Sequence, residues 1–378
     1  MKFPTTSTRR EFLIASAAAC GAAAIVRAAD GKRGREVAWL KEVQQGPAKP
    51  PAGVPKLAPL LVDAKGRAIT TIGAWRARRE ALRRWWIDFL GVLPRAKMPP
   101  KYKVLKEDRD AGALRQLIRY EVEPGVPIEA YLLMPLKIAG RVPGVVVLHS
   151  TVDHTIRQPA GVQGKPQKAF GLKLARRGMV AICPRNFLWD GKTDNKYTEH
   201  VRRFHRRHPK SKGMARMLHD AQVATDILAA LPQVDPQRLG SVGHSLGAKE
   251  VLYLAAFDER IKATVSSEGG LATTYSNWDA PWYLGETIRD KRAFTHEHHE
   301  LLALCAPRAM LILGGDSADG DRSWPLVAAA LKVYDLHQGP SRLGLFNHKK
   351  GHAVPKEATQ RIDEWLGTYL YSGRLHRS

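Results

Sequence analysis

Ser245 is the residue of this 378-residue chain whose surroundings most clearly predict nucleophilic chemistry. It stands in the middle of Gly-His-Ser-Leu-Gly (243–247), after an apolar run (239–242) and before a stretch of helical character (250–257). A strand, a sharp turn and a helix present a serine hydroxyl at the apex of the turn, and the flanking glycines leave room for the adjacent backbone. The pattern predicts a nucleophile; the alternative is a glycine-rich turn with a bystander serine.

A serine hydroxyl becomes a nucleophile only when a neighbouring base accepts its proton, and that base needs an acid to orient it. Behind a nucleophile turn of this kind, the chain order is serine, acid, histidine. His348 and His352 satisfy that order, because both lie in the loop before the last predicted helix (356–371). His352 follows a glycine and lies closest to that helix, so we predict it as the base, with His348 as the alternative.

The acid has several candidates. Asp316, Asp319 and Asp321 lie in a glycine-containing loop after a predicted strand (308–313), and the usual spacing favours Asp319 and then Asp316. Glu268 follows the preceding predicted strand and also comes before His352 in the chain. A loop carboxylate that only accepts backbone hydrogen bonds is the alternative role for Glu268, so the acid stays open.

Acyl transfer also needs hydrogen-bond donors for the developing oxyanion, each worth on the order of 3 kcal/mol. The backbone N–H of Leu246 is predicted as one donor, because it lies at the start of the helix after Ser245. The second is expected from Ser150 or Thr151, which follow a continuous apolar run (142–148).

Aromatic residues gather in a long irregular segment (271–297) that is expected to overhang the strand ends. Trp278, Trp282 and Tyr283 could stack on a sugar ring there or simply pack in the core. The nearby run His-Glu-His-His-Glu (296–300) lacks two histidines four residues apart, so we expect no metal site and no cofactor.

Strands and helices alternate from about residue 116 onward, which predicts an α/β fold with a mostly parallel central sheet and helices on both faces. In such a sheet, chemistry collects at the carboxyl ends of the strands. An antiparallel pair (116–123 and 128–135) is expected at one edge, and an amphipathic helix (72–93) with core tryptophans precedes it. A polar stretch (184–212) with an arginine-rich run (202–208) is predicted as a solvated loop, with a phosphate-binding patch or a contact to an acidic sugar as the alternatives.

Charge and the N-terminal sequence bear on location and partners. The 60 Lys and Arg residues against 36 Asp and Glu give a net charge of +24, spread along the chain, which we interpret as a basic exported protein and not a nucleic-acid binder. Arg9-Arg10 before a mild apolar run predicts a twin-arginine signal peptide over residues 1–28 and a periplasmic or secreted protein. That run is too short and alanine-rich for a stable membrane span, although an uncleaved anchor is the alternative. An N-terminal arm and helix (29–110) and a catalytic domain (111–378) are expected to follow.

Several stretches together resemble a known group of enzymes. Gly-His-Ser-x-x-x-Lys (243–249), Ser-x-Glu-x-Gly (266–270), the segment 299–308 and Gly-His-Ala-Val-Pro (351–355) are similar to the branch of the α/β-hydrolase superfamily that holds bacterial glucuronoyl methylesterases and acetylxylan-esterase-like, dienelactone hydrolase-related proteins. The resemblance implies the α/β-hydrolase fold, Ser245 as nucleophile and His352 as base. It also implies an acid at Glu268 and a sugar-hydroxyl contact at Lys249.

One position departs from that pattern. Glucuronoyl esterases usually carry arginine directly after the serine, and this chain has Leu246. We therefore expect an exported serine carboxylic-ester hydrolase that acts on acetyl or glucuronoyl esters of plant polysaccharide or its fragments, through an acyl-enzyme on Ser245. A small-molecule dienelactone-type hydrolase and a noncatalytic ligand-binding protein of the same fold are the alternatives.

Overall fold

A computed structural model describes residues 36–109, 112–189, 197–290 and 292–371. The chain divides into two units, Met1–Val37 and Ala38–Ser378, and the second contains every element discussed below. The predicted signal peptide (1–28) lies outside the described residues. No helix in the described ranges is long and apolar enough to cross a membrane.

In the described part of the chain, nine strands form one sheet in the order β1-β2-β3-β5-β4-β6-β7-β8-β9. Neighbouring strands from β5 to β9 pair in parallel, whereas β1, β2, β3 and β5 pair antiparallel. The strands are β1 (Tyr102–Asp108), β2 (Ala113–Glu123), β3 (Val126–Pro135), β4 (Val142–Leu148), β5 (Val180–Pro184), β6 (Val234–His244), β7 (Ile261–Ser267), β8 (Ala309–Gly314) and β9 (Leu343–Asn347).

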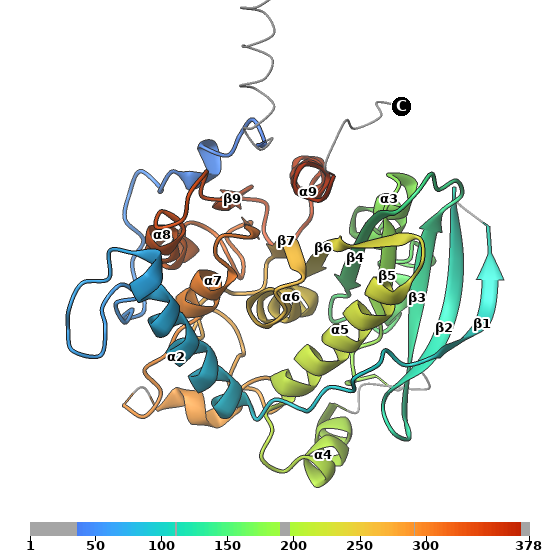
Figure 1. Ribbon diagram of the computed structural model, residues 1–378, viewed down its shortest axis with the longest axis horizontal. Helices are drawn as coiled ribbons and strands as arrows, with labels where there is room; N and C mark the ends of the chain where they lie inside the picture. The colour runs from blue at the N-terminus through green and yellow to red at the C-terminus, as the bar shows by residue number, and fades with distance from the viewer. Residues whose placement is uncertain (1–35, 110–111, 190–196, 291, 372–378) are drawn as a thin grey trace, which may run out of the picture. The chain divides into compact units, whose positions relative to one another are not determined.

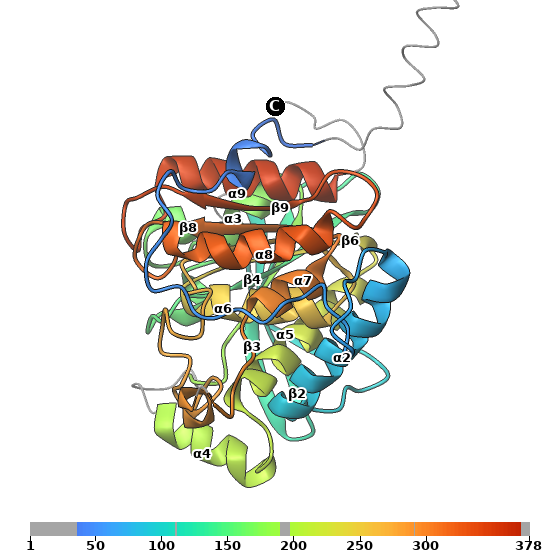
Figure 2. The same cartoon turned by 90° about the vertical axis from the view of Figure 1, so that its left-hand side faces the viewer.

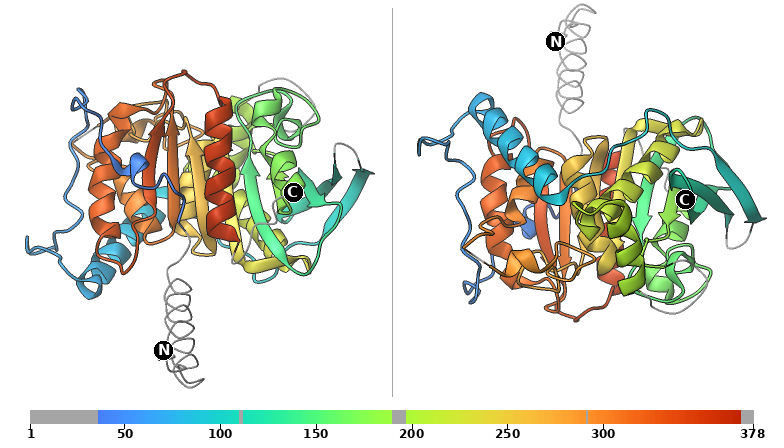
Figure 3. Two further views of the ribbon diagram at one scale, coloured as in Figure 1. Left: turned by 90° about the horizontal axis from the view of Figure 1, so that it is seen from above. Right: turned by 90° about the horizontal axis from the view of Figure 1, so that it is seen from below.

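Helices cover both faces of this sheet, as Figures 1 and 3 show. Helices α3 and α9 lie on one face, and α5 and α6 lie on the other, where α7, α8 and α2 extend the layer (Figures 1 and 2). The helices are α2 (Ile72–Leu90), α3 (Phe170–Arg176), α4 (Tyr197–Arg207), α5 (Gly213–Ala230), α6 (Leu246–Phe257), α7 (His299–Cys305), α8 (Trp324–Tyr334) and α9 (Lys356–Leu370).

The predicted α/β architecture is confirmed, because buried parallel strands alternate with covering helices. The strand β4 is as apolar and buried as its sequence indicates. The predicted antiparallel pair is β2 and β3, joined by a tight turn. Helix α2 buries Trp75 and Trp86 as core residues, and Trp86 donates a hydrogen bond from Nε1 to Glu300 Oε2 at 2.8 Å.

One local expectation was wrong, and one strand was not predicted. The arginine-rich run predicted as a loop belongs mostly to helix α4, which buries Val201 and Phe204 and exposes its arginines. The apolar positions three residues apart were masked by the surrounding charge. Strand β1 was not predicted, because its inner residues are exposed and two of them are lysines; its partner β2 makes it a strand.

Candidate active site

Ser245 lies at the junction of β6 and α6 in a strained backbone conformation. Its φ of 60° and ψ of −114° are outside the regions that non-glycine residues prefer, and its N–H donates to the carbonyl of Ser267 at 2.8 Å. A Cβ on Gly243 would overlap the backbone of Gly247, and one on Gly247 would overlap the carbonyl of Leu148. The two glycines are therefore required by the close approach of strand and helix, as the sequence predicts.

His352 lies in the loop between β9 and α9, and its ring faces Glu268. His352 Nδ1 is 3.5 Å from Glu268 Oε2, and the Glu268 carboxylate is completely buried. Glu268 directly follows β7 and has a φ of 58°, a left-handed conformation that is uncommon for glutamate. This conformation turns the side chain across the end of the sheet toward β8.

A backbone cradle holds the Glu268 carboxylate in that position. Oε1 accepts a hydrogen bond from the N–H of Gly315, and Oε2 accepts from Ala318 at 2.6 Å and Asp319 at 3.2 Å. All three donors belong to the loop after β8, the same loop that supplied the aspartate candidates. That loop therefore positions the Glu268 carboxylate, which follows the neighbouring strand, through its backbone N–H groups.

The aspartates of that loop have other partners. Asp319 is buried, and its carboxylate accepts from the N–H groups of Gly270 at 2.8 Å and Leu271 at 2.7 Å and from the Ser323 hydroxyl at 2.7 Å. Burial raises the pKa of Asp319, although these donors oppose the shift. Its contacts join the loops that follow β7 and β8, and Asp319 is not among the residues that line the pocket of Ser245 and His352.

Asp316 and Asp321 both accept from the side-chain amide of Asn347, at 2.7 Å and 2.8 Å. They tie the end of β9 to the same loop and so steady the segment that leads to His352. His348 is buried; its Nδ1 accepts from the N–H of Lys350 at 3.1 Å, and it does not line the pocket that contains Ser245. Of the two histidines, only His352 lines the pocket that contains Ser245.

Ser245, His352 and Glu268 line one pocket of about 250 Å³ at the carboxyl ends of the strands. Thr151 and Leu246 line the same pocket. The Leu246 side chain is buried in the core, so only its backbone N–H at the start of α6 is available to an oxyanion. Ser150 is buried behind Thr151 and its hydroxyl has no hydrogen-bond partner among the described residues.

Aromatic rings form the walls of this pocket. Trp282 and Tyr283 come from the predicted overhanging segment, and Trp189 and Tyr197 come from the stretch predicted as a polar loop. The Tyr197 ring packs between two of the others. Its centre is 5.0 Å from that of Trp189 and 5.6 Å from that of Trp282. Sequence reasoning missed Trp189 and Tyr197, because the surrounding charge hid two isolated aromatic residues.

Lys249 is buried beside the pocket under aromatic rings. Its Nζ lies 4.0 Å from the centre of the Trp278 ring and 4.9 Å from that of Tyr283, and it has no hydrogen-bond partner within the described ranges. Burial lowers the pKa of Lys249 to about 7, since the ammonium loses its water. Trp278 is fully buried, so it supports Lys249 and does not form an open sugar platform.

His244, a residue not singled out from the sequence, packs against His352. Its ring centre is 4.7 Å from that of His352, and its Nδ1 is 3.0 Å from the Ser267 hydroxyl. Burial is the main cause that lowers the pKa of His244 well below its ordinary value. The residue before Ser245 thus packs against the ring of His352.

The described residues contain no group of three His, Cys, Asp or Glu side chains that could hold a metal ion. In the histidine-rich run, His296 Nδ1 pairs with Glu300 Oε2 at 2.7 Å, and the His298 Nε2 is 2.8 Å from the Tyr253 hydroxyl. These histidines are parts of the core beneath α2.

Comparisons with known proteins agree with the fold. The model of the dienelactone hydrolase family matches residues 128–284, a segment that includes Ser245 and Glu268 but not His352. No curated protein sequence matches the chain significantly.

Solved structures match over most of the chain. A glucuronoyl esterase from Solibacter usitatus matches with a TM-score of 0.66 and 16% identity, covering 85% of this chain and all of the other. A CE15 glucuronoyl esterase from Teredinibacter turnerae matches with 0.60 and 20% over 83% and 88%. Acetyl xylan esterase 1 from Thermoanaerobacterium sp. matches with 0.54 and 18% over 78% and 94%.

At these identities the likeness is one of fold, and the chain has the α/β-hydrolase fold. The predicted resemblance to the dienelactone hydrolase, glucuronoyl esterase and acetyl xylan esterase group is confirmed. The predicted enzyme class, a carboxylic ester hydrolase, agrees with the family match and with the esterases among the structural neighbours.

Proposed function

We propose that the protein is a serine carboxylic-ester hydrolase that acts on ester substituents of plant polysaccharide or its fragments. The observation that carries the proposal is the meeting of Ser245, His352 and Glu268 in one pocket, with the nucleophile on a strained turn at the start of a helix. A serine, a histidine and a buried carboxylate in this order form the constellation that acyl transfer needs.

In the proposed mechanism, the Ser245 hydroxyl attacks the ester carbonyl while His352 accepts its proton. Glu268 faces His352 Nδ1, so it orients the ring and stabilises the imidazolium that forms. The oxyanion lies against the N–H of Leu246 and a donor of the loop at Thr151. His352 then returns the proton to the leaving alcohol, and water releases the acid from Ser245 by the reverse sequence.

The surroundings of the pocket support a carbohydrate substrate. Trp282 is partly exposed at the pocket and offers a ring face for a sugar. Lys249 also lines the pocket, and its Nζ has no hydrogen-bond partner among the described residues, so a sugar hydroxyl can accept a hydrogen bond from that group. Structural neighbours that are glucuronoyl and acetyl xylan esterases favour these two acyl classes.

Turnover of p-nitrophenyl acetate by the wild-type protein and its loss in S245A test the enzyme class. Product analysis on acetylated xylan and on a glucuronate methyl ester, run in parallel, then assigns the acyl group. Absence of turnover with every activated ester contradicts the proposal and favours a noncatalytic binding protein.

A dienelactone-type hydrolase of small molecules is the second candidate, because the family match carries that name. The pocket of about 250 Å³ can enclose such a small molecule without any contribution from the neighbouring surface. A higher kcat/KM for a small lactone than for any oligosaccharide ester would favour this candidate.

We also propose that residues 1–28 direct export through the twin-arginine route, which makes the protein periplasmic or secreted. The paired Arg9 and Arg10 support this. Replacing both with lysine should keep the protein in the cytoplasmic fraction, and N-terminal sequencing of the exported wild-type chain distinguishes cleavage after Ala28 from an uncleaved anchor.

A further inference from the structure

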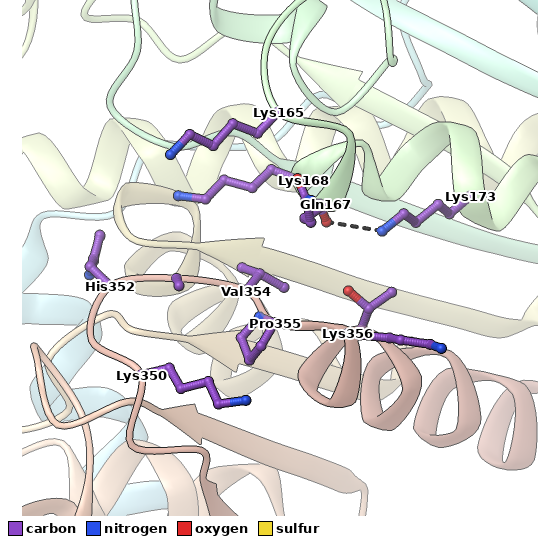
Figure 4. A pocket seen from close by; sticks show the side chains of 11 residues that line it. Lys165, Gln167, Lys168, Lys173, Lys350, His352, Val354, Pro355 and Lys356 are labelled. Atoms are coloured by element: carbon purple, nitrogen blue, oxygen red, sulfur yellow. Dashed lines mark hydrogen bonds between the residues drawn. The ribbon is translucent and has the colours of Figure 1, made fainter.

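A second cavity of about 830 Å³ opens beside the active site and is lined by five lysines (Figure 4). One rim is formed by the segment before and within α3, and the other by the loop and first turn of α9. The lysines are Lys165, Lys168, Lys173, Lys350 and Lys356. We call this cavity the lysine groove.

The lysine groove concentrates positive charge, although the Asp363 carboxylate acts on Lys173 and the Glu268 carboxylate acts on Lys168 from outside the lining. Within the described ranges, none of its five lysines forms an ion pair with a carboxylate, and no aspartate or glutamate lines the cavity. Lys173 donates to the carbonyl of Gln167 at 3.1 Å, a neutral partner. In contrast, Arg216 forms ion pairs with both Glu123 and Asp220. The groove therefore presents five ammonium groups without a contacting carboxylate in the described part of the chain.

The groove adjoins the candidate active site at His352, which lines both the groove and the pocket that contains Ser245. In Figure 4 the side chains of Lys165 and Lys168 extend on the same side as His352, across from Lys350. Lys168 is half-buried, and its pKa is lowered by burial and by Lys165 while the Glu268 charge opposes the shift. The groove and the Ser245 pocket therefore meet at His352.

We propose that the lysine groove binds the anionic groups, carboxylate or sulfate, of an acidic polysaccharide chain whose ester group lies at Ser245. This inference rests on the proposed function and narrows its substrate class from plant polysaccharide in general to polyanionic chains. Lysine ammonium groups act as point charges for such anions and need no fixed bidentate geometry, which suits a polymer with irregularly placed charges.

The composition of the groove disfavours nucleic acid. Single-stranded nucleic acid is held by bases stacked on aromatic rings together with a basic groove, and the only ring system lining this cavity is the His352 imidazole, apart from the Pro355 ring. The charges are all lysine, whereas the exposed charges of α4 are mostly arginine. A flexible sugar chain that passes His352 fits both facts.

Calorimetric titration of the full chain carrying S245A tests the proposal, because this variant binds without turnover. The probes are a hexagalacturonate, a chondroitin sulfate hexasaccharide, xylohexaose and a twelve-residue oligothymidylate, each at 0.15 M and 0.5 M NaCl. The groove variant is K168Q/K350Q/K356Q, and the matched control is K101Q/K103Q/K106Q, which removes three exposed lysines at β1. The double variant K350Q/K356Q, at two exposed positions, replaces the triple if that variant melts early.

We expect one or both acidic hexasaccharides to bind about tenfold more tightly than xylohexaose, and the groove variant to lose about tenfold in affinity for them. The higher salt concentration should weaken this binding, since it shortens the screening length to a few Å. The control should keep the wild-type affinity. The relative affinities of the two acidic probes identify carboxylate or sulfate as the preferred anion.

Equal binding of neutral and acidic hexasaccharides, or an unchanged affinity in the groove variant, overturns the proposal. So does oligothymidylate that binds as tightly as the acidic sugars and loses affinity in the same variant. Failure of the proposed function is a separate result: a protein that cleaves no activated ester but binds acidic sugars through these lysines keeps the groove and loses the esterase. A protein that cleaves esters without any preference for acidic chains does the reverse.

Discussion

Glu268→Gln should lower kcat/KM strongly, and Asp319→Asn should not, because only Glu268 faces His352. In the transition state His352 carries a positive charge, with its Nδ1 3.5 Å from Glu268 Oε2. Two unit charges of opposite sign at 3.5 Å attract by about 5 kcal/mol at an effective dielectric constant of about 20. The His352 side chain is 42% exposed, so solvent screens this attraction, and about 2–3 kcal/mol is the expected remainder.

That energy corresponds to a decrease in kcat/KM of about 30- to 150-fold for p-nitrophenyl acetate. A glutamine can keep its carbonyl oxygen toward Ala318 and His352 only by turning its amide toward the N–H of Gly315, where two donors then meet. We therefore also expect a lower melting temperature for E268Q.

Asp319→Asn is the matched control, because it also removes a buried carboxylate from the loop after β8. That carboxylate accepts hydrogen bonds from Gly270, Leu271 and Ser323. It should destabilise the fold by about 1–3 kcal/mol and change kcat/KM less than tenfold at a temperature where it stays folded. Steady-state kinetics and thermal melting of both variants decide the matter. Wild-type kcat/KM in E268Q, or an equal loss of activity in fully folded D319N, refutes the assignment of Glu268 as the acid.

Three further results are expected. Gly315→Ala should reduce kcat/KM at least tenfold and cost about 1–3 kcal/mol of stability, because a Cβ there overlaps the His348 ring and the Gly351 carbonyl and displaces the Glu268 cradle; unchanged kinetics would show that the cradle does not position the acid. Lys249→Met should raise the melting temperature more at pH 6 than at pH 9.5. The pKa of Lys249 is about 7 against an ordinary 10.5, so the folded wild type holds a desolvated charge below pH 7, and this cost disappears as the pH rises toward 10.5; an equal shift at both pH values contradicts this. Trp282→Ala should raise KM for an acetylated xylo-oligosaccharide about 2- to 10-fold, and more than it raises KM for p-nitrophenyl acetate; equal effects on both substrates would exclude sugar stacking at this ring.

Features of the candidate site that depend on short stretches of chain could be predicted from the sequence alone. Ser245 could be placed because the nucleophile turn is a short-range structure whose steric demands appear directly as Gly243 and Gly247. Chain order leaves one loop for the predicted base, and His352 is preferred to His348 there because it follows a glycine and lies closest to the last helix. The alternating strands and helices also predicted the sheet, since burial on both faces produces continuous apolar runs such as β4.

Which carboxylate faces His352, that of Glu268 or that of Asp319, depends on the tertiary structure. Glu268 and Asp319 both follow strand ends, and the sequence separates them only by spacing. The left-handed backbone at Glu268 and the three N–H donors of the next loop turn its carboxylate toward His352, whereas Asp319 is occupied by Gly270 and Leu271. Almost every residue type has a backbone N–H group, so the three donors to Glu268 leave no recognisable motif in the sequence.

The pocket walls and the lysine groove likewise combine residues that are distant in the sequence and meet only in the folded chain. Trp189 and Tyr197 reach the pocket from a stretch dominated by charge, and the groove joins lysines of residues 165–173 to lysines of residues 350–356. In the sequence these lysines are a few among 60 basic residues. Their proximity depends on α3 and the start of α9 lying on the same face of the sheet, so only the fold sets them apart from the general positive charge of the chain.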